Sequence, residues 1–205
     1  MRLLSVRQLF AAMSVLAAFT AGARTAAEVF VDAPYDVLPL LRSNTRLDLL
    51  DYFNHSMPNT SPNRMGGEAK IIECSDSRLL ASVSRDATVE IALVPVKNDT
   101  VTLVIETVLT PLADSSISFY DSKWKKIGVS GIPGASAPSG KKGEKVSTSD
   151  IVFMAASYDP TENVLVFRNT TGGYYSAADR PDWLDKMPSK FTMKFDGKKL
   201  IPAEK

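Results

Sequence analysis

The feature of this 205-residue chain that most constrains its fold is a change in hydrophobic periodicity near Ala69. Before that point, apolar residues recur every three or four positions, which is the spacing of one helix face. After it, apolar and polar residues alternate, as in strands. Strands outnumber helices and follow one another through short turns. The pattern therefore predicts an α+β fold, strand-rich, with N-terminal helices packed on a mainly antiparallel β-sheet.

Two helical segments are expected before the strands. Residues 36–41 are mostly apolar but contain a proline, which predicts a short or bent turn of helix. Residues 45–54 place Leu47, Leu50 and Phe53 on one side of a helix, with Leu49 beside them. The second segment is therefore expected to be an amphipathic helix with these three residues on its apolar face.

Four strands are expected between residues 79 and 121. The segment 101–109 has apolar residues on both faces, which indicates a central strand covered on one side and at least partly on the other. Because the connections are short, the strands should form an antiparallel meander. Their expected ranges are 79–84, 89–93, 101–109 and 117–121.

Residues 128–149 are rich in glycine and lysine and predict a flexible loop. This loop divides the expected mature chain into residues 24–127, with the helices and the meander, and residues 150–205. The second part is expected to contain β-hairpins and a short helix, in the same domain or in a closely packed second one.

Three elements are expected in that second part. Residues 150–157 and 163–169 should pair as a hairpin. Residues 177–187 should include a short helix capped by Asp179. The dipeptide Asp196-Gly197 then predicts a two-residue hairpin turn between the last two strands.

Residues 1–23 have the three parts of a cleavable secretory signal peptide. A positive start is followed by an apolar run over residues 9–19, which is shorter than the roughly 20 residues of a membrane-spanning helix. Small residues then precede the expected cleavage site after Ala23, with Ala27 as the alternative. The mature protein is thus expected to be periplasmic or extracellular, without a transmembrane segment.

The net charge and the numbers of cysteines and histidines limit which partners and cofactors the chain is expected to bind. Loss of Arg2 and Arg7 with the signal peptide leaves 22 basic and 23 acidic residues, a net charge of −1. A near-neutral chain has no electrostatic reason to bind nucleic acid. Its only cysteine, Cys74, permits no internal disulfide, and together with the only histidine, His55, it excludes the usual zinc sites. No cofactor or metal is expected.

Short motifs for catalysis fail when their context is considered. Ser139 and Lys142 match Ser-x-x-Lys, but they lie in the Gly- and Lys-rich segment and no Ser-Asp-Asn or Lys-Thr-Gly element follows. A Ser-His-Asp triad would need His55, which follows the end of a predicted helix. No catalytic residue is therefore assigned.

Carboxylates occur in two pairs with helical spacing. Asp48 with Asp51, and Asp182 with Asp185, each share a helix face, but neither place has the loop that calcium requires. Carboxylates near a helix start are common because they interact favourably with the helix dipole. Thr45, three residues before Asp48, also resembles the start of a capping box. A structural role is therefore favoured for both pairs.

Two aromatic clusters allow more than one interpretation. Lys123 and Lys125 on either side of Trp124 are typical of an edge strand with a buried tryptophan and outward lysines. Tyr174 and Tyr175 lie outside any clear strand. Packing into the core is the favoured interpretation for the two tyrosines, and an exposed platform for a sugar or a peptide is the alternative.

The chain resembles a domain-of-unknown-function family of small exported proteins from Bacteroides-type bacteria. The likeness covers most of the mature chain, and its most specific parts are Asn44-Thr-Arg-Leu-Asp48 and Ser118-Phe-Tyr-Asp-Ser-Lys-Trp124. It also includes residues 37–53, 66–67, 75–76, 104–107 and 111. The resemblance implies a Gram-negative envelope setting and adds no catalytic residue. In such bacteria Asp99-Thr100-Val101 looks like an O-glycosylation acceptor at Thr100.

The leading hypothesis is a non-enzymatic periplasmic or cell-surface protein that binds an envelope protein or glycan. Its basis is the predicted export signal together with the lack of a convincing catalytic motif. Two alternatives remain open: an envelope hydrolase whose site is not visible in the sequence, and a structural subunit of an envelope assembly.

Overall fold

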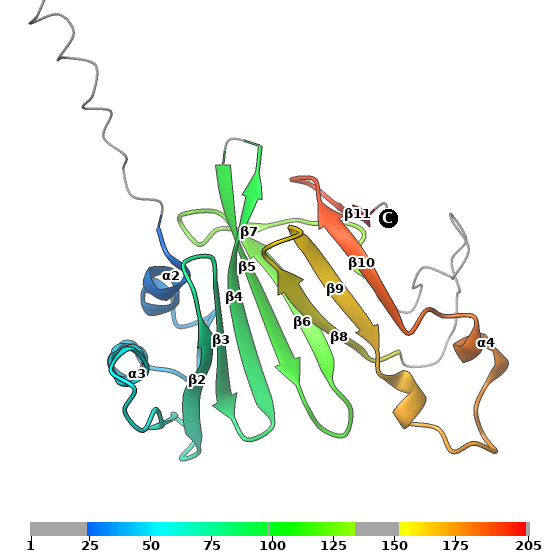
Figure 1. Ribbon diagram of the computed structural model, residues 1–205, viewed down its shortest axis with the longest axis horizontal. Coiled ribbons are helices and arrows are strands. Elements are labelled where there is room, and N and C mark those ends of the chain that lie inside the picture. The colour runs from blue at the N-terminus through cyan, green and yellow to red at the C-terminus, as the bar shows by residue number, and fades with distance from the viewer. Residues whose placement is uncertain (1–23, 98, 134–151, 204–205) are drawn as a thin grey trace, which may run out of the picture.

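The computed structural model describes residues 24–97, 99–133 and 152–203, and it is built mainly from two antiparallel sheets (Figure 1). The expectation of a strand-rich, antiparallel protein with few helices is confirmed. The predicted signal peptide and residues 134–149 of the predicted flexible loop lie outside the described residues. Among the described helices, none is long and apolar enough to cross a membrane.

The first sheet is a seven-stranded meander in which every strand pairs with its neighbours in sequence. This order confirms the predicted meander and extends it at both edges. Its longest pairing joins β4 to β5 over ten residue pairs, from Ala87↔Val108 to Val96↔Asp99. The strands are β1 (Ser61–Pro62), β2 (Glu68–Cys74), β3 (Arg78–Ser84), β4 (Ala87–Val96), β5 (Asp99–Val108), β6 (Asp114–Tyr120) and β7 (Lys126–Ile127).

The second sheet has the order β11-β10-β9-β8. Its strands are β8 (Met154–Asp159), β9 (Val164–Asn169), β10 (Lys190–Phe195) and β11 (Leu200–Pro202). The predicted hairpin of β8 and β9 is confirmed. The two-residue turn predicted at Asp196-Gly197 is wrong, because Phe195 pairs with Leu200 and four residues lie between them. The Asp196 side chain accepts two backbone N–H bonds inside this longer turn and thereby stabilises it.

Helix α2 (Ala26–Asp32) was not expected from the sequence. It begins with a complete capping box, in which the Thr25 hydroxyl accepts the Glu28 N–H and the Glu28 carboxylate accepts the Thr25 N–H. The bond from the Thr25 backbone holds the pKa of the Glu28 carboxyl below its usual value. The capping box of Thr25 and Glu28 lies beside the two candidate cleavage sites, which follow Ala23 and Ala27.

Helix α3 spans Ser43–Asn54, so it begins two residues before the predicted start. The capping box predicted at Thr45 is wrong, since the N-cap is Arg42 and has no side-chain capping bond. The expected apolar face is also partly wrong: Leu47 is 51% exposed, whereas Leu49 is fully buried. Residues 36–41, predicted as a turn of helix, form turns without a helix.

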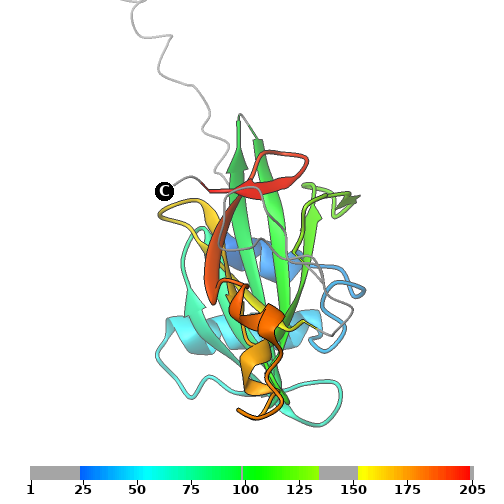
Figure 2. The same ribbon diagram turned by 90° about the vertical axis from the view of Figure 1, so that its right-hand side faces the viewer.

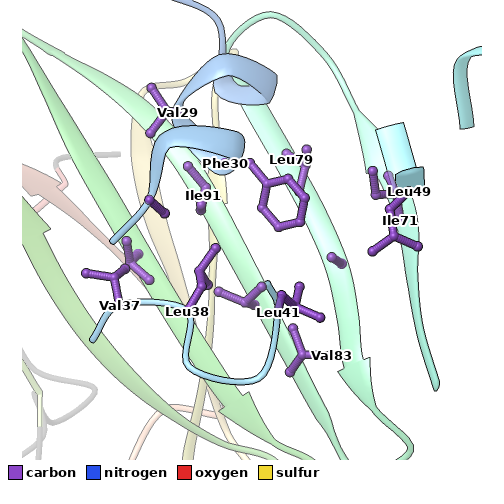
Figure 3. Close-up of a cluster of buried hydrophobic side chains, with 14 of the residues drawn as sticks. Val29, Phe30, Val37, Leu38, Leu41, Leu49, Ile71, Leu79, Val83 and Ile91 are labelled. Atoms are coloured by element: carbon purple, nitrogen blue, oxygen red, sulfur yellow. The ribbon is translucent and has the colours of Figure 1, made fainter. Parts of the chain in front are cut away.

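The first hydrophobic cluster lies between the N-terminal helices and the first sheet (Figure 3). Val29 and Phe30 of α2 point toward Leu79 of β3 and Ile91 of β4 (Figure 3). Leu49 of α3 lies near the β2 edge of the same cluster. The side chains facing this cluster alternate along each strand, as the two-residue period requires.

The opposite face of the first sheet packs on the second sheet (Figure 2). The second hydrophobic cluster joins Leu103 and Phe119 of the first sheet to Leu165 and Phe195 of the second. The Phe119 and Phe195 rings stack with their centroids 4.3 Å apart. The first sheet is therefore buried on both faces at its centre, as the apolar pattern of the central strand predicted.

The outer edge of β8 is hydrogen-bonded to side chains of the first sheet. Three β8 backbone N–H groups donate to them: Met154 to Oδ1 of Asp114 (3.0 Å), Ala156 to Oγ of Ser115 (2.9 Å) and Tyr158 to Oε1 of Glu90 (2.8 Å). An open strand edge would be a template for pairing with another chain. These bonds remove that template and attach the second sheet to the first.

Two short helical segments follow β9. They are the 3-10 helix η1 (Thr171–Gly173) and α4 (Asp182–Asp185). The short helix predicted within residues 177–187 is therefore confirmed as α4. Its N-cap is Pro181, so Asp179 is not the cap; Asp179 instead accepts a 2.6 Å hydrogen bond from Ser176.

The predicted edge strand around Trp124 is also wrong. Residues 121–125 form a turn in which Asp121 Oδ1 accepts the N–H groups of Lys123 and Lys125. These bonds hold the pKa of the Asp121 carboxyl below its usual value. Trp124 has a positive φ of 61° and packs its half-buried ring 5.5 Å from that of Tyr120.

Candidate functional site

His55 and Cys74, the chain's only histidine and only cysteine, lie in separate places. His55 follows the last residue of α3, and its Nδ1 lies 3.1 Å from an Asp51 carboxylate oxygen at an exposed position. Cys74 ends β2, is half-buried against the first cluster, and has its thiol pKa raised by burial. A raised pKa reduces the thiolate fraction, so Cys74 is a poor nucleophile.

The paired carboxylates do not assemble into a site. Asp51 pairs with His55, and Asp185 pairs with Arg180 at 2.9 Å. Within the described ranges, no group of three or more His, Cys, Asp or Glu side chains is arranged to hold a metal ion. Ser139 and Lys142 lie outside the described residues.

The residues predicted for signal-peptide cleavage lie near the described N-terminus, and the residue predicted for O-glycosylation lies at the start of a strand. Ala23 lies outside the described residues, whereas Ala27 is inside α2. Thr100, the possible O-glycosylation acceptor, is exposed in the second position of β5. These positions do not test cleavage or glycosylation, and both stay predictions.

A chain of four aromatic side chains lies near η1 and α4, and we call it the aromatic surface: Phe153, Tyr174, Tyr175 and Trp183. Each ring contacts the next, with centroid separations of 6.0, 5.3 and 6.4 Å in that order. The last two contacts are edge-to-face, a favoured arrangement for aromatic pairs. Tyr174 is 64% exposed. Helix α4 lies at the end of the molecule remote from α2 and α3 (Figure 1).

Two threonines anchor this surface to the sheets. Thr171, which is fully buried, accepts the Phe153 N–H at 2.9 Å through its hydroxyl. The Thr170 hydroxyl donates to the carbonyl of Ala113, before β6, at 2.7 Å. The backbone leading into Tyr174 is therefore attached to both sheets.

Two glycines allow close packing beneath Tyr174. A Cβ on Gly173 would lie 2.9 Å from a methyl carbon of Leu112. A Cβ on Gly172 would lie 3.1 Å from an Arg180 guanidinium nitrogen. Replacing either glycine would push these neighbours away, so the Gly-Gly pair brings Leu112 and Arg180 close to the aromatic surface.

Charged groups follow Tyr175 in the chain. The Arg180 guanidinium forms an exposed ion pair with Asp185, and Ser176 donates to Asp179. Asp182 is also exposed. The segment thus places a guanidinium donor and carboxylate acceptors close in sequence to the aromatic rings. Such a combination suits a ligand that has both apolar faces and hydroxyl groups.

A separate cleft of about 650 Å³ lies near the start of α2. It is lined by Arg24, Thr25, Val29, Asp76, Ser77, Leu93, Pro95, Asp99, Thr100, Thr102, Ser122, Tyr158 and Pro160. The Tyr158 hydroxyl donates to Asn163 at 2.9 Å, and burial raises the pKa of Tyr158 to about 12. Tyr158 therefore keeps its proton at neutral pH and can donate this hydrogen bond.

Two arginines, the buried Arg46 and the partly buried Arg78, have structural partners. Arg46 in α3 donates to the carbonyls of Phe30 and Ala33, at the end of α2. Arg78 in β3 makes two bonds to the buried carboxylate of Glu90, and these bonds raise the pKa of Arg78. Arg46 is the arginine of the Asn-x-Arg-Leu-Asp motif, so in this structure the motif joins two helices.

The described residues define a strand-rich protein of two antiparallel sheets with an aromatic surface at one end. The chain belongs to the family described as "Protein of unknown function (DUF3256)", which matches residues 18–199. The predicted resemblance to a domain-of-unknown-function family is therefore confirmed. No curated protein matches the chain.

The chain is also similar to a solved structure described as "Structure of a domain of an uncharacterized protein from Porphyromonas gingivalis W83". The TM-score is 0.67 at 18% identity, and the match covers 89% of this chain and 100% of that one. At this identity the likeness concerns the fold alone. The source is a Bacteroidetes species, in agreement with the predicted group of bacteria.

Proposed function

We propose that this chain is an exported, non-enzymatic binding protein of the bacterial envelope, acting in the periplasm or at the cell surface. The predicted signal peptide supports export. The observation that supports binding is Tyr174, a large aromatic side chain that stays 64% exposed beside three further rings. Exposed aromatic side chains on anchored loops are typical of recognition surfaces.

We propose cleavage of the signal peptide after Ala23, in preference to Ala27. Cleavage after Ala27 would remove Thr25, which caps α2 together with Glu28. It would also remove Ala26, which is fully buried in the first cluster. Cleavage after Ala23 preserves both contributions to the stability of α2.

Mass spectrometry of the exported protein tests the cleavage site. The expected N-terminal residue is Arg24. An N-terminus at Glu28 would contradict the preference for Ala23, and an intact Met1 would contradict export through a cleaved signal.

Thr100 is our candidate for O-glycosylation because it is exposed at the start of β5. The intact mass of the exported protein should exceed the sequence mass by a glycan, and Thr100→Val should remove the excess. An unmodified wild-type mass would contradict this proposal without affecting the binding function.

The binding function is tested with residues 24–205, labelled and incubated with isolated envelopes of the producing bacterium. Saturable binding is expected, and Tyr174→Ala should weaken it. Tyr35→Ala is a matched control, because Tyr35 is 62% exposed and lies outside the aromatic surface. Absence of saturable binding by the folded wild-type protein would refute the proposed function.

A further inference from the structure

The exposed ring of Tyr174 is held in place by its neighbours. Trp183 packs beside Met154 and Met187 in the third hydrophobic cluster. Tyr175 contacts Trp183, and Tyr174 in turn contacts Tyr175 and Phe153. A ring supported from two sides loses little conformational freedom when a ligand binds. The aromatic surface is therefore pre-organised.

The small size of the exposed apolar area favours a small ligand over a protein partner. Tyr174 is 64% exposed, whereas Phe153, Tyr175 and Trp183 are half-buried. A stable protein–protein interface buries about 800 Å² on each partner around a central apolar cluster. One exposed ring with charged neighbours offers much less apolar area than that. It does match the apolar C–H face of a single sugar ring.

The charges near the aromatic surface favour a neutral ligand. Asp179, Asp182 and Asp185 are all exposed in the segment that follows Tyr175, against the two cations Arg180 and Lys186. Three carboxylates and two cations leave a net charge of −1, which gives no electrostatic attraction for an anionic polymer. Sugar hydroxyls, in contrast, bond well to both carboxylates and guanidinium groups.

We propose that the aromatic surface binds a neutral polysaccharide of the bacterial envelope, with one sugar ring stacked on the exposed face of Tyr174. Arg180 and the neighbouring carboxylates bond to the hydroxyls at the rim of that sugar. This inference rests on the proposed binding function and names the ligand class for it.

Three substitutions of Tyr174 separate stacking from general hydrophobic contact. Tyr174→Phe keeps the ring and should retain binding within about threefold. Tyr174→Leu and Tyr174→Ala remove the ring, and each should weaken binding at least tenfold, about 1.4 kcal/mol. Tyr35→Ala should leave binding unchanged, since Tyr35 is not part of the aromatic surface. Its ring instead contacts the Arg64 guanidinium, which lies 4.7 Å from the ring centroid. Circular dichroism and thermal unfolding confirm that each variant is folded.

The experiment measures binding of residues 24–205 to isolated envelopes in competition with protein-free polysaccharide released from the same envelopes. The polysaccharide should compete, and its competition should disappear after metaperiodate has opened its sugar rings. Equal affinity of Tyr174→Leu and wild type would overturn the stacking proposal. So would competition that survives metaperiodate.

The experiment gives different results if the polysaccharide proposal is wrong and if the proposed binding function is wrong. If envelopes bind the protein but the polysaccharide does not compete, the glycan proposal is overturned and a protein partner is indicated. If untreated envelopes bind no protein, the proposed function itself fails.

Discussion

Replacing Glu90 by alanine removes an acceptor at the junction of the two sheets. Glu90 is 3% exposed on β4. Its carboxylate accepts two bonds from Arg78, at 2.9 and 3.1 Å, and one from the Tyr158 N–H at 2.8 Å. Among the described residues, the substitution leaves the mostly buried guanidinium of Arg78 with Glu73 as its remaining ionic partner, and it removes the acceptor of the Tyr158 N–H.

The expected loss of unfolding free energy is about 3–5 kcal/mol. Removal of one partner of a buried ion pair costs about that much, because the other charge stays in a poorly solvated place. The unsatisfied Tyr158 N–H accounts for about 1–3 kcal/mol of it. Since a domain is typically stable by about 5–15 kcal/mol, Glu90→Ala should fold but with a large part of its stability lost.

The assay is equilibrium urea unfolding of residues 24–205, followed by circular dichroism and tryptophan fluorescence. Glu106→Ala is the matched control: this glutamate is exposed on the adjacent β5, and its loss should change stability by no more than about 0.5 kcal/mol. The double variant Arg78→Met/Glu90→Leu should be more stable than Glu90→Ala, because it leaves no unpaired charge in a buried place; Glu73, which loses Arg78, is 57% exposed. A Glu90→Ala protein as stable as the control would refute the reasoning.

Four further outcomes are expected. Arg46→Met should lose about 2–3 kcal/mol in urea unfolding, because it removes two charge-assisted bonds to carbonyls at the end of α2; wild-type stability would contradict this. Gly131→Ala should also destabilise, by about 1–3 kcal/mol, since φ is +80° and a Cβ would lie 2.5 Å from the Leu200 carbonyl oxygen. Tyr158, whose pKa is raised from 10.0 to about 12, stabilises the fold below pH 10, and this contribution should disappear as the pH rises toward 12. Tyr158→Phe should flatten that part of the alkaline stability curve. Cys74 should react with maleimide more slowly in the folded protein than in urea, and equal rates would show an accessible thiol.

The meander was predictable because its signals are local. In β4 and β5 every second residue over Val89–Leu93 and over Val101–Ile105 is apolar, and the turn between the strands is polar, so strand positions and neighbours follow from a short stretch of sequence. The same pattern put Glu90 among the polar residues of β4. Its burial was not predictable, because the second sheet that covers it comes from a distant part of the chain.

The helices show where local patterns fail. Leu47, Leu50 and Phe53 have helical spacing, yet Leu47 is exposed and Arg46 is 3% exposed. The helix buries Arg46 because its guanidinium bonds to the end of α2. These two bonds offset part of the cost of burying a charged side chain, and the spacing of leucines along the helix does not reveal them.

Only part of the aromatic surface could be predicted from the sequence. The adjacent tyrosines Tyr174 and Tyr175 mark it, and packing into the core was the favoured interpretation. That interpretation is wrong for Tyr174, which is exposed, whereas Tyr175 is half-buried. The contributions of Phe153 and Trp183 have no sequence signal, since contact between them and the tyrosines depends on how η1 and α4 lie on the sheets.

By itself, the sequence determined where the central strands β3 to β6 lie, which of their faces are apolar, and that neighbouring strands pair as a meander. Those properties depend on residues a few positions apart, and side-chain periodicity records them. Only the tertiary structure decided that Glu90 and Ser115 accept bonds from β8, that Arg46 joins two helices, and that Tyr174 stays exposed. Each of these depends on which distant segment packs against a residue, and this is set by the shared core rather than by local pattern.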